Sequence, residues 1–246
     1  MATSSLRFPK RALLIGNNDY DVNKLQRCKN DAEDVANQLE RLGFEATSHF
    51  NLKYMGMTDK INDFLANIME NDLIVFFFSG HGTEWHENNY LIPIDNKALI
   101  QRPDRHQHLA VSSQTILESM KKKNPFAIVF LLDCCRVHSE GTKDLPVPSD
   151  STIASTIKGV AGSLVVFAYG PNENAFDRSP NTRNSLFTYH LLKHIGERNL
   201  KIDEIMCRVC DGVYEDSAGQ LYTYRLSSLQ TSQVYFNFTT TGTVSL

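Results

Sequence analysis

Uninterrupted apolar runs of strand length recur along the chain, and two of them end directly in reactive side chains. Residues 73–78 are followed by Ser79-Gly80-His81-Gly82, and residues 126–132 are followed by Asp133-Cys134-Cys135-Arg136. Runs of this kind are typical of strands that are buried on both faces of a parallel sheet. Because ligands bind at the carboxyl ends of strands in open α/β sheets, we expect both clusters to lie at one functional edge.

The periodicity of the remaining chain predicts helices that alternate with further strands. The predicted strands cover residues 11–16, 44–50 and 164–168, and the predicted helices cover about 32–42, 61–68, 112–123, 185–195 and 202–214. Two closing strands are expected over residues 221–226 and 234–238, the second at an edge of the sheet. The alternating order implies right-handed crossovers, and therefore an α/β fold with helices on both faces of a mostly parallel sheet.

Length and composition are those of an ordinary globular protein. The chain has 246 residues, of which 41% are hydrophobic and 22% charged, and no segment has the composition of a linker. We therefore expect a single domain over residues 1–246, with its core at about residues 10–238. The net charge of −3 argues against nucleic-acid binding as the main function.

The sequence also argues against a membrane or secreted protein. No apolar run approaches the roughly 20 residues that a membrane-spanning helix needs, and residues 1–11 lack the apolar core of a signal peptide. Five cysteines, two of them adjacent, make a poor disulfide framework and suit reduced thiols. We therefore expect a cytoplasmic or nuclear protein.

His81 and one of the adjacent thiols, Cys134 or Cys135, form a candidate catalytic dyad. A thiol at its ordinary pKa is only a few per cent thiolate at neutral pH, so a cysteine hydrolase needs a base or a cation beside its nucleophile. His81 could take up the thiol proton and later protonate the leaving amine. The backbone N–H groups of Gly82 and Cys135 could donate to the oxyanion. Alternation along a strand puts the two cysteines on opposite faces, so only one can point toward His81.

These two motifs resemble the His and Cys motifs of the caspase-like cysteine proteases, and among these they are most similar to paracaspases and metacaspases. The resemblance extends from about residue 11 to residue 238, and the 54 residues from His81 to Cys135 are close to the roughly 50 of caspases. It implies a caspase-like three-layer sandwich, with Cys135 as the nucleophile and Cys134 as its buried neighbour. No cofactor and no bound metal are expected.

The residues after the nucleophile separate the related groups. Metacaspases typically have His-Ser-Gly there, whereas this chain has Arg136-Val137-His138-Ser139, which favours the paracaspase side and weakens the expectation of calcium activation. A calcium-activated protease of the metacaspase type remains an alternative. A second alternative is a catalytically idle caspase-like scaffold, although an idle module has no chemical need for both His81 and Cys135.

The resemblance further implies protein substrates that are cleaved after a basic residue. Asp31 and Asp133 match the acidic pocket positions of the family, and Glu173 and Asp177 lie in a loop that resembles its third pocket segment. A buried carboxylate is costly unless a cation joins it, and a planar guanidinium can satisfy one bidentately. We therefore predict Arg at the P1 position, ahead of Lys. Asp31 alone also fits a helix N-cap.

Three further expectations concern assembly, processing and metal binding. The resemblance supports a homodimer, for which the edge strand at residues 234–238 offers strand pairing. Autocleavage after Lys143 or Arg183 rests only on a loop position and a basic side chain. A zinc site is an alternative role for four side chains whose spacing helical periodicity explains equally well, namely His190, His194, Cys207 and Cys210.

Overall fold

A computed structural model describes residues 8–85, 88–102, 105–138, 159–169 and 179–239, apart from the side chains of residues 106 and 135–138. In chain order, the elements are β1 (Lys10–Gly16), α1 (Cys28–Arg41), β2 (Glu45–Phe50), α2 (Tyr54–Asn67), β3 (Leu73–Trp85), β4 (Asn88–Leu91), α3 (Lys97–Gln101), α4 (His106–Leu109), β5 (Val111–Ser112), α5 (Ser113–Lys121), β6 (Ala127–His138), β7 (Ser163–Phe167), α6 (Leu186–His194), α7 (Ile202–Asp216) and β8 (Tyr224–Ser227).

The strands form one sheet in the order β2-β1-β3-β6-β7-β8. The first four pairings along this order are parallel, and β8 joins β7 in the antiparallel sense. The short strands β4 and β5 lie off this path, with β4 antiparallel to the last residues of β3. The α/β fold with a mostly parallel sheet is thus confirmed.

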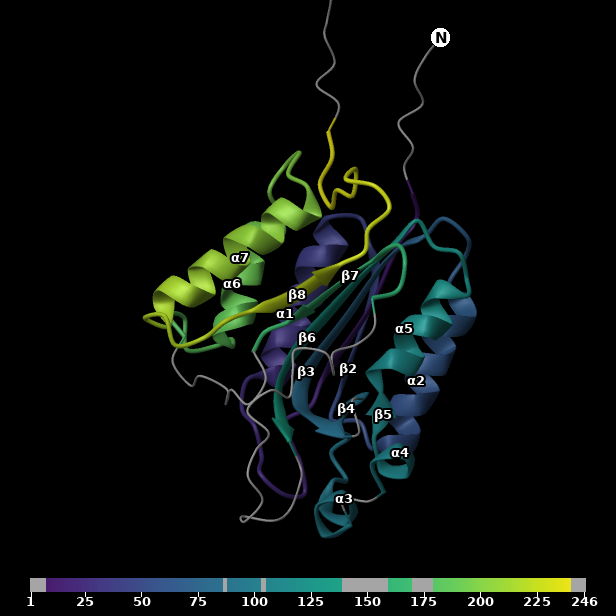
Figure 1. Cartoon of the computed structure of the whole chain (residues 1–246), viewed down its shortest axis with the longest axis vertical. Helices are drawn as coiled ribbons and strands as arrows, with labels where there is room; N and C mark the ends of the chain where they lie inside the picture. The colour runs from purple at the N-terminus through teal and green to yellow at the C-terminus, as the bar shows by residue number, and fades with distance from the viewer. Residues whose placement is uncertain (1–7, 86–87, 103–104, 139–158, 170–178, 240–246) are drawn as a thin grey trace, which may run out of the picture.

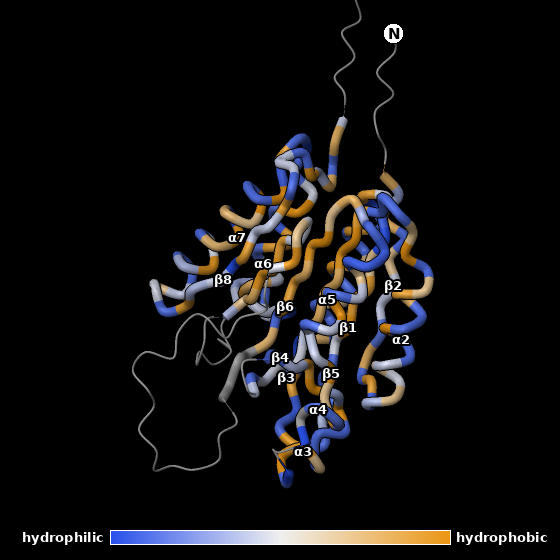
Figure 2. The backbone as a smooth tube through the Cα atoms, turned by 45° about the vertical axis from the view of Figure 1, so that its right-hand side comes forward, coloured by the Kyte–Doolittle hydropathy of each residue, from blue (hydrophilic) through white to orange (hydrophobic). Residues whose placement is uncertain are grey.

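Helices cover both faces of the sheet, as Figure 1 shows. One face packs against α1, α6 and α7 in a cluster that includes Leu14, Val75 and Phe187, and the other packs against α2 and α5 in a cluster that includes Phe76 and Phe130. The two clusters take alternate residues of the same central strands, and Figure 2 shows these strands as the most apolar part of the chain. This three-layer arrangement holds the carboxyl ends of β3 and β6 on a rigid base.

Local signals explain several element boundaries. The Ser112 hydroxyl accepts a hydrogen bond from the Thr115 N–H at 3.3 Å and caps α5, as the sequence predicts. Helix α1 ends at Arg41, and Gly43 follows in the left-handed region with a φ of 84°. By contrast, α1 already begins at Cys28, so that Asp31 lies in its first turn and is not its N-cap.

Two predicted strand boundaries are wrong. Strand β3 does not end with the apolar run at residue 78 but continues to Trp85, because β4 pairs with residues 82–85 on one side and β6 continues beside it on the other. Residues 234–238 form no strand. They make an isolated bridge between Lys201 and Tyr235, and their carbonyls accept from the N–H groups of Ile202 and Asn199. Their alternating pattern arises because Val234 and Phe236 insert into the core, and the edge strand on this side is β8.

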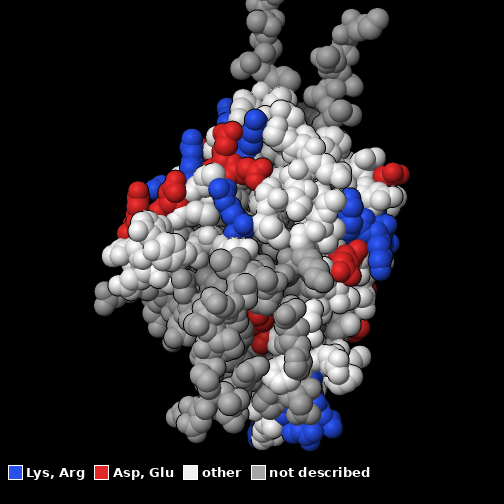
Figure 3. Space-filling view, in the orientation of Figure 1, with Lys and Arg blue, Asp and Glu red and all other residues white. Residues whose placement is uncertain are grey.

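Figure 3 shows the charged side chains on one face of the molecule. Acidic and basic side chains are interspersed over its described residues, with basic ones gathered at the lower tip and at the right-hand edge of the view. None of the helices in the described ranges is long and apolar enough to span a membrane.

Candidate active site

The parallel ladder between β3 and β6 brings the two reactive motifs into register. Its pairs include Ser79 with Asp133 and His81 with Cys135. Neighbouring strands lie about 4.8 Å apart, so the backbone positions of the candidate dyad are adjacent. The backbone of Cys135 lies in β6, whereas its side chain lies outside the described part of the chain.

Strand alternation separates the two adjacent cysteines. The side chain of Cys134 is buried in the apolar cluster on the α2 and α5 side. The carboxylate of Asp133 faces the other side, where the Thr188 hydroxyl of α6 donates to it at 2.7 Å. Residue 135 therefore belongs to the same face as Asp133, and this face also carries Ser79 and His81.

His81 is held by groups that fix its tautomer. Its Nε2–H donates to the Asn23 carbonyl oxygen at 2.6 Å, and since a carbonyl can only accept, Nδ1 of the neutral ring is left as the basic nitrogen. The backbone N–H of His81 donates to the Tyr20 hydroxyl at 2.8 Å, and the two rings lie 4.4 Å apart. Burial lowers the pKa of His81, and the bond to Asn23 only partly opposes this, so the surroundings favour the neutral ring.

The glycine before the histidine permits this close packing. A Cβ atom at Gly80 would lie 2.4 Å from the Tyr20 hydroxyl oxygen and 2.7 Å from the Phe78 ring. The Tyr20 hydroxyl in turn donates to the Ile92 carbonyl at 3.1 Å, which ties the histidine to the segment after β4. The motif thus provides space for a buried tyrosine that supports the end of β3.

A cavity of about 500 Å³ opens beside His81. Its wall is formed by the β1–α1 loop, the start of α1, the ends of β3 and β6, and the residue before α6. Asp31 and Asp133 line it, and both are almost fully buried. The loop adds two cations, Lys24 and Arg27, so the cavity combines a buried acidic floor with a partly basic wall.

The two buried carboxylates share a small set of donors. Asp31 accepts from the Ser79 hydroxyl at 3.0 Å and from the Ser185 N–H at 2.9 Å, and Asp133 accepts from the hydroxyls of Ser185 and Thr188. Burial raises the pKa of both carboxyls, and the neighbouring Asp133 raises that of Asp31 further. Neither forms an ion pair within the described residues, so the two carboxylates line the cavity without a cationic side chain bound to either of them there.

Comparison with known proteins places this geometry in a family. Residues 9–240 match the family model of the caspase domain. The chain belongs to the caspase domain family. It is also 28% identical, over 209 residues, to the human and the mouse mucosa-associated lymphoid tissue lymphoma translocation protein 1. That alignment covers 84% of this chain but only 23% of each relative, and it supports the paracaspase-like resemblance. A caspase domain of this kind is a cysteine-peptidase fold.

Of four other residues named from the sequence for this caspase domain, the structure describes one. Glu173, Asp177 and Lys143 lie outside the described residues. Arg183 is described, and its guanidinium is bound by Asp34 and Glu33 on α1. Cleavage after Arg183 would first require that guanidinium to leave both carboxylates.

The predicted oxyanion donors lie along the seam between β3 and β6. The N–H of His81 points to Tyr20, and its carbonyl accepts from the Ile92 N–H at 3.0 Å, so both groups face away from β6. Because successive residues of a strand alternate, the N–H of Gly82 faces β6, where Gly82 is in register with Arg136. The Gly82 amide is therefore adjacent to the dyad, but it is directed into the ladder and not into the cavity.

The four side chains of the zinc alternative contact other groups. Nε2 of His190 lies 2.9 Å from an Asp216 oxygen, and the Cys207 sulfur accepts from Arg225 at 3.0 Å. Among the described residues, no group of three or more His, Cys, Asp or Glu side chains is placed to hold a metal ion. The geometry gives the zinc alternative no support.

Several residues that shape the site were not identified from the sequence. Tyr20 and Asn23 orient His81 from a loop that has no motif of its own. Ser185 precedes an apolar run at helical spacing, which is the signal for an N-cap, and its hydroxyl does accept from the Thr188 N–H at 3.0 Å. Nothing in that local signal shows that the same serine also bonds to both carboxylates.

Proposed function

We propose that this caspase domain is an active cysteine endopeptidase that cleaves proteins after Arg, ahead of Lys, with Cys135 as the nucleophile and His81 as the base. The observation that carries the proposal is the register of the β3–β6 ladder. It pairs His81 with Cys135 directly beside a cavity whose floor is two buried carboxylates. A dyad and a charge-selective pocket on one sheet edge are the two parts that a specific protease needs.

The fixed tautomer of His81 supports its role as the base. With Nε2–H bound to Asn23, Nδ1 takes the proton of the Cys135 thiol, and the thiolate attacks the scissile carbonyl carbon. The same proton then passes from Nδ1 to the leaving amine, and water hydrolyses the acyl-enzyme. The lowered pKa of His81 keeps the ring available as a base at and below neutral pH.

Oxyanion stabilisation by Gly82 and Cys135 requires a local change at the end of the ladder. In the present ladder the N–H of Gly82 faces β6, and the N–H of Cys135 faces β3, because alternate residues of each strand face the partner strand. We infer that β3 and β6 part beyond His81 when a substrate binds, which frees both N–H groups for the developing negative charge. The buried halves of the two strands need not move.

The preference for Arg follows from the shape and charge of the donor set. Asp31 and Asp133 already have hydroxyl and amide donors, and a guanidinium can fill the remaining acceptor positions of both with its planar array of N–H groups. A Lys ammonium is a more compact charge and cannot span two carboxylates with the same geometry. An Asp side chain at P1 would add a third carboxylate.

A homodimer through the outermost strand is part of the proposal. At the end of the sheet formed by the C-terminal part of the chain the outermost strand is β8, so strand pairing there would involve Tyr224–Ser227 and not residues 234–238. Sedimentation of the wild type and of Ser227→Pro tests this. The Ser228 N–H donates to Ser163 on the β7 side, so the N–H of Ser227 faces the free edge, and a proline there removes a donor of that edge. A wild type that is monomeric at high concentration and fully active contradicts the dimer.

The deciding experiment is cleavage of matched fluorogenic peptides that end in Arg, Lys or Asp. It compares the wild type with Cys135→Ala, each with calcium and with a chelator. Arg cleavage that is lost in the variant and independent of calcium supports the proposal. Cleavage after Asp would refute the pocket assignment, and cleavage that depends on calcium would favour the metacaspase alternative. If a dimeric preparation cleaves none of the peptides, the idle scaffold is favoured.

A further inference from the structure

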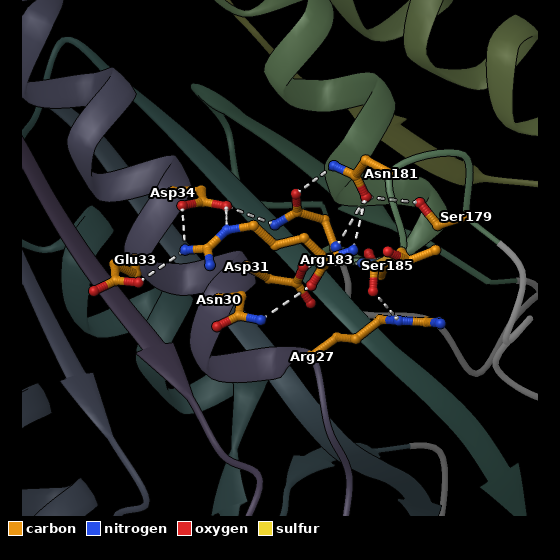
Figure 4. Close-up of polar contacts among 11 residues, drawn as sticks. Arg27, Asn30, Asp31, Glu33, Asp34, Ser179, Asn181, Arg183 and Ser185 are labelled. Atoms are coloured by element: carbon orange, nitrogen blue, oxygen red, sulfur yellow. Dashed lines mark hydrogen bonds and ion pairs between the residues drawn. The ribbon is translucent and has the colours of Figure 1, made fainter.

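The segment before α6 docks on α1 through a dense polar network that the catalytic mechanism does not use. Figure 4 shows this segment, residues 179–185, lying along the first two turns of α1. The sequence separation between the two partners is about 150 residues, so the contact is a product of the fold and not of local structure. The segment leads directly into the cavity, because Ser185 is one of its lining residues.

The centre of the network is Arg183. Its Nε and Nη2 donate to the two oxygens of Asp34 at 2.7 and 2.8 Å, which is a bidentate pair, and Nη2 also lies 3.0 Å from Glu33. The Asn184 side chain donates to the same Asp34 carboxylate at 2.9 Å. The Arg183 guanidinium holds the pKa of Asp34 below its usual value. Bidentate geometry with a second carboxylate makes this pair more specific than an isolated surface ion pair.

Helix α1 also binds the backbone of the segment. The Asn30 side chain donates to the Arg183 carbonyl at 3.2 Å, and Arg27 donates to the Thr182 carbonyl at 3.3 Å. Within the segment, the Asn181 side chain accepts from the N–H groups of Arg183 and Asn184 at 3.1 and 3.0 Å. The path of the chain is therefore fixed from residue 181 up to Ser185.

Ser185 connects this network to the acidic floor of the cavity. Its N–H donates to Asp31, its hydroxyl donates to Asp133, and the same hydroxyl accepts from the Thr188 N–H as the cap of α6. One residue thus touches both carboxylates and the helix terminus. Ser185 directly follows Asn184 in the chain. The position of Ser185 therefore depends on where the bonds of Arg183 and Asn184 to Asp34 hold the segment.

We propose that Ser185 is a specificity-determining residue of the basic P1 pocket, and that Arg183, bound to Asp34, is the positioning residue that holds it there. This inference rests on the proposed Arg-selective function. By spanning Asp31 and Asp133, Ser185 sets the spacing and orientation of the two acceptors that the P1 guanidinium must meet. Its donors also favour the charged form of each carboxylate, which is the form that binds a cation.

Substitutions at Ser185 or Arg183 should affect substrate binding and leave the chemical step unchanged. His81 bonds to Tyr20 and Asn23, and neither Ser185 nor Arg183 is among its partners in the described part of the chain. Loss of Ser185 or of the clamp should therefore raise KM for Arg peptides and leave kcat nearly unchanged. A general loss of structure would instead lower kcat and thermal stability together.

The test measures kcat and KM for Arg peptides with Ser185→Ala, Arg183→Ala, Asp34→Ala and the double variant of the last two. We expect KM to rise about tenfold for Ser185→Ala and several-fold for each clamp variant, with kcat within about twofold of the wild type. The double variant should be no worse than either single clamp variant, because the two residues act as one pair. Arg183→Lys should recover only part of the loss, since Lys cannot make the bidentate pair.

Ser112→Ala is the matched control for helix capping. Ser112 caps α5 as Ser185 caps α6, with its hydroxyl accepting from the N–H three residues on, but it does not line the cavity. The control should lose a similar amount of stability with an unchanged KM. An unchanged KM in Ser185→Ala, or an equal rise in Ser112→Ala, would overturn the inference.

A binding measurement separates this inference from the proposed function. Calorimetry of an acetylated peptide ending in arginine amide is carried out in a Cys135→Ala background, with and without Ser185→Ala. If the peptide binds tenfold more weakly to Cys135→Ala/Ser185→Ala than to Cys135→Ala, the inference holds even where the wild type proves inactive. If the wild type cleaves Arg peptides and both variants bind the probe equally, the function stands and the inference fails.

Discussion

Strands β3 and β6 contain two regions that share one ladder and have opposite properties. In the first region, residues 73–78 lie beside residues 127–132, and every one of these side chains is buried. In the second, Ser79 and His81 lie beside Asp133 and Cys135, and the same ladder borders a cavity. The fold therefore places stability and chemistry on successive stretches of the same strands, which suggests that substitutions can separate the two.

The largest expected effect is on chemistry in the second region. Cys135→Ala should reduce kcat/KM for Arg peptides by at least about a thousandfold, because the nucleophile is lost, while unfolding free energy changes by roughly 0.5 kcal/mol or less. Peptide cleavage and urea unfolding measure the two quantities. Cys134→Ala is the control, since Cys134 lies in the apolar cluster and should affect stability more than rate. If Cys134→Ala is the inactive variant, the assignment of the nucleophile is wrong.

The next effect is on stability in the first region. Phe130 is fully buried and its ring stacks on Phe76 at 4.6 Å, so Phe130→Ala should lower the free energy of unfolding by about 3–5 kcal/mol. At a temperature where the variant is folded, its kcat should match the wild type. Phe238→Ala provides a matched surface control, because that ring is 55% exposed. An equal loss in both variants would contradict the contrast between the two regions.

Tyr20→Phe tests the connection between the regions and should have an intermediate effect. It removes the hydroxyl that accepts from the His81 N–H and donates to the Ile92 carbonyl. We expect a loss of about 1–3 kcal/mol in stability, because the His81 N–H loses its acceptor and the Ile92 carbonyl loses one of its donors, and a fall of roughly tenfold in kcat as His81 gains freedom. Tyr222→Phe, at an exposed ring, serves as the control for both assays. A wild-type kcat in Tyr20→Phe would show that the hydroxyl does not position the base.

The first region could be predicted from sequence, and the second only in part. Continuous apolar runs identify buried strands, and the rule for carboxyl ends of parallel strands brings His81 and Cys135 to one edge. The apolar run ends at residue 78, however, and local sequence does not show that β4 pairs with residues 82–85 and keeps them extended. Local propensity was overridden there by a partner strand.

Local sequence also does not show the distant partner of Asp31 or the backbone pairing of residues 234–238. The helix signal at Asp31 is equally consistent with an N-cap, and what decides its role is the N–H of Ser185, which is 154 residues away in sequence. Residues 234–238 alternate between buried and exposed as an edge strand does, but the alternation reflects Val234 and Phe236 inserting into the core. Periodicity reports which side chains are buried and does not report which backbone they pair with.

The smallest expected effect is a pH dependence that arises from the acidic floor. Burial raises the pKa of Asp31 and Asp133 above that of an unfolded Asp, about 3.9, so the folded protein retains protons that the unfolded chain releases. This contribution to stability is present below pH 4 and is lost as the pH rises through the raised pKa values. His81 has the opposite sign, because its lowered pKa costs stability as the pH falls below about 6.5.

Urea unfolding between pH 5 and 8.5 separates these contributions by comparing the wild type with Asp31→Asn/Asp133→Asn. The variant should gain stability relative to the wild type as the pH rises, by on the order of 1 kcal/mol, because neutral amides carry no desolvated charge. An arginine-amide peptide should stabilise the wild type most at the alkaline end, where both carboxylates are charged, and should not stabilise the variant. A difference between the two proteins that is independent of pH would mean that the carboxylates do not titrate in this range. The acidic floor would then be a fixed part of the fold and would not require a cation.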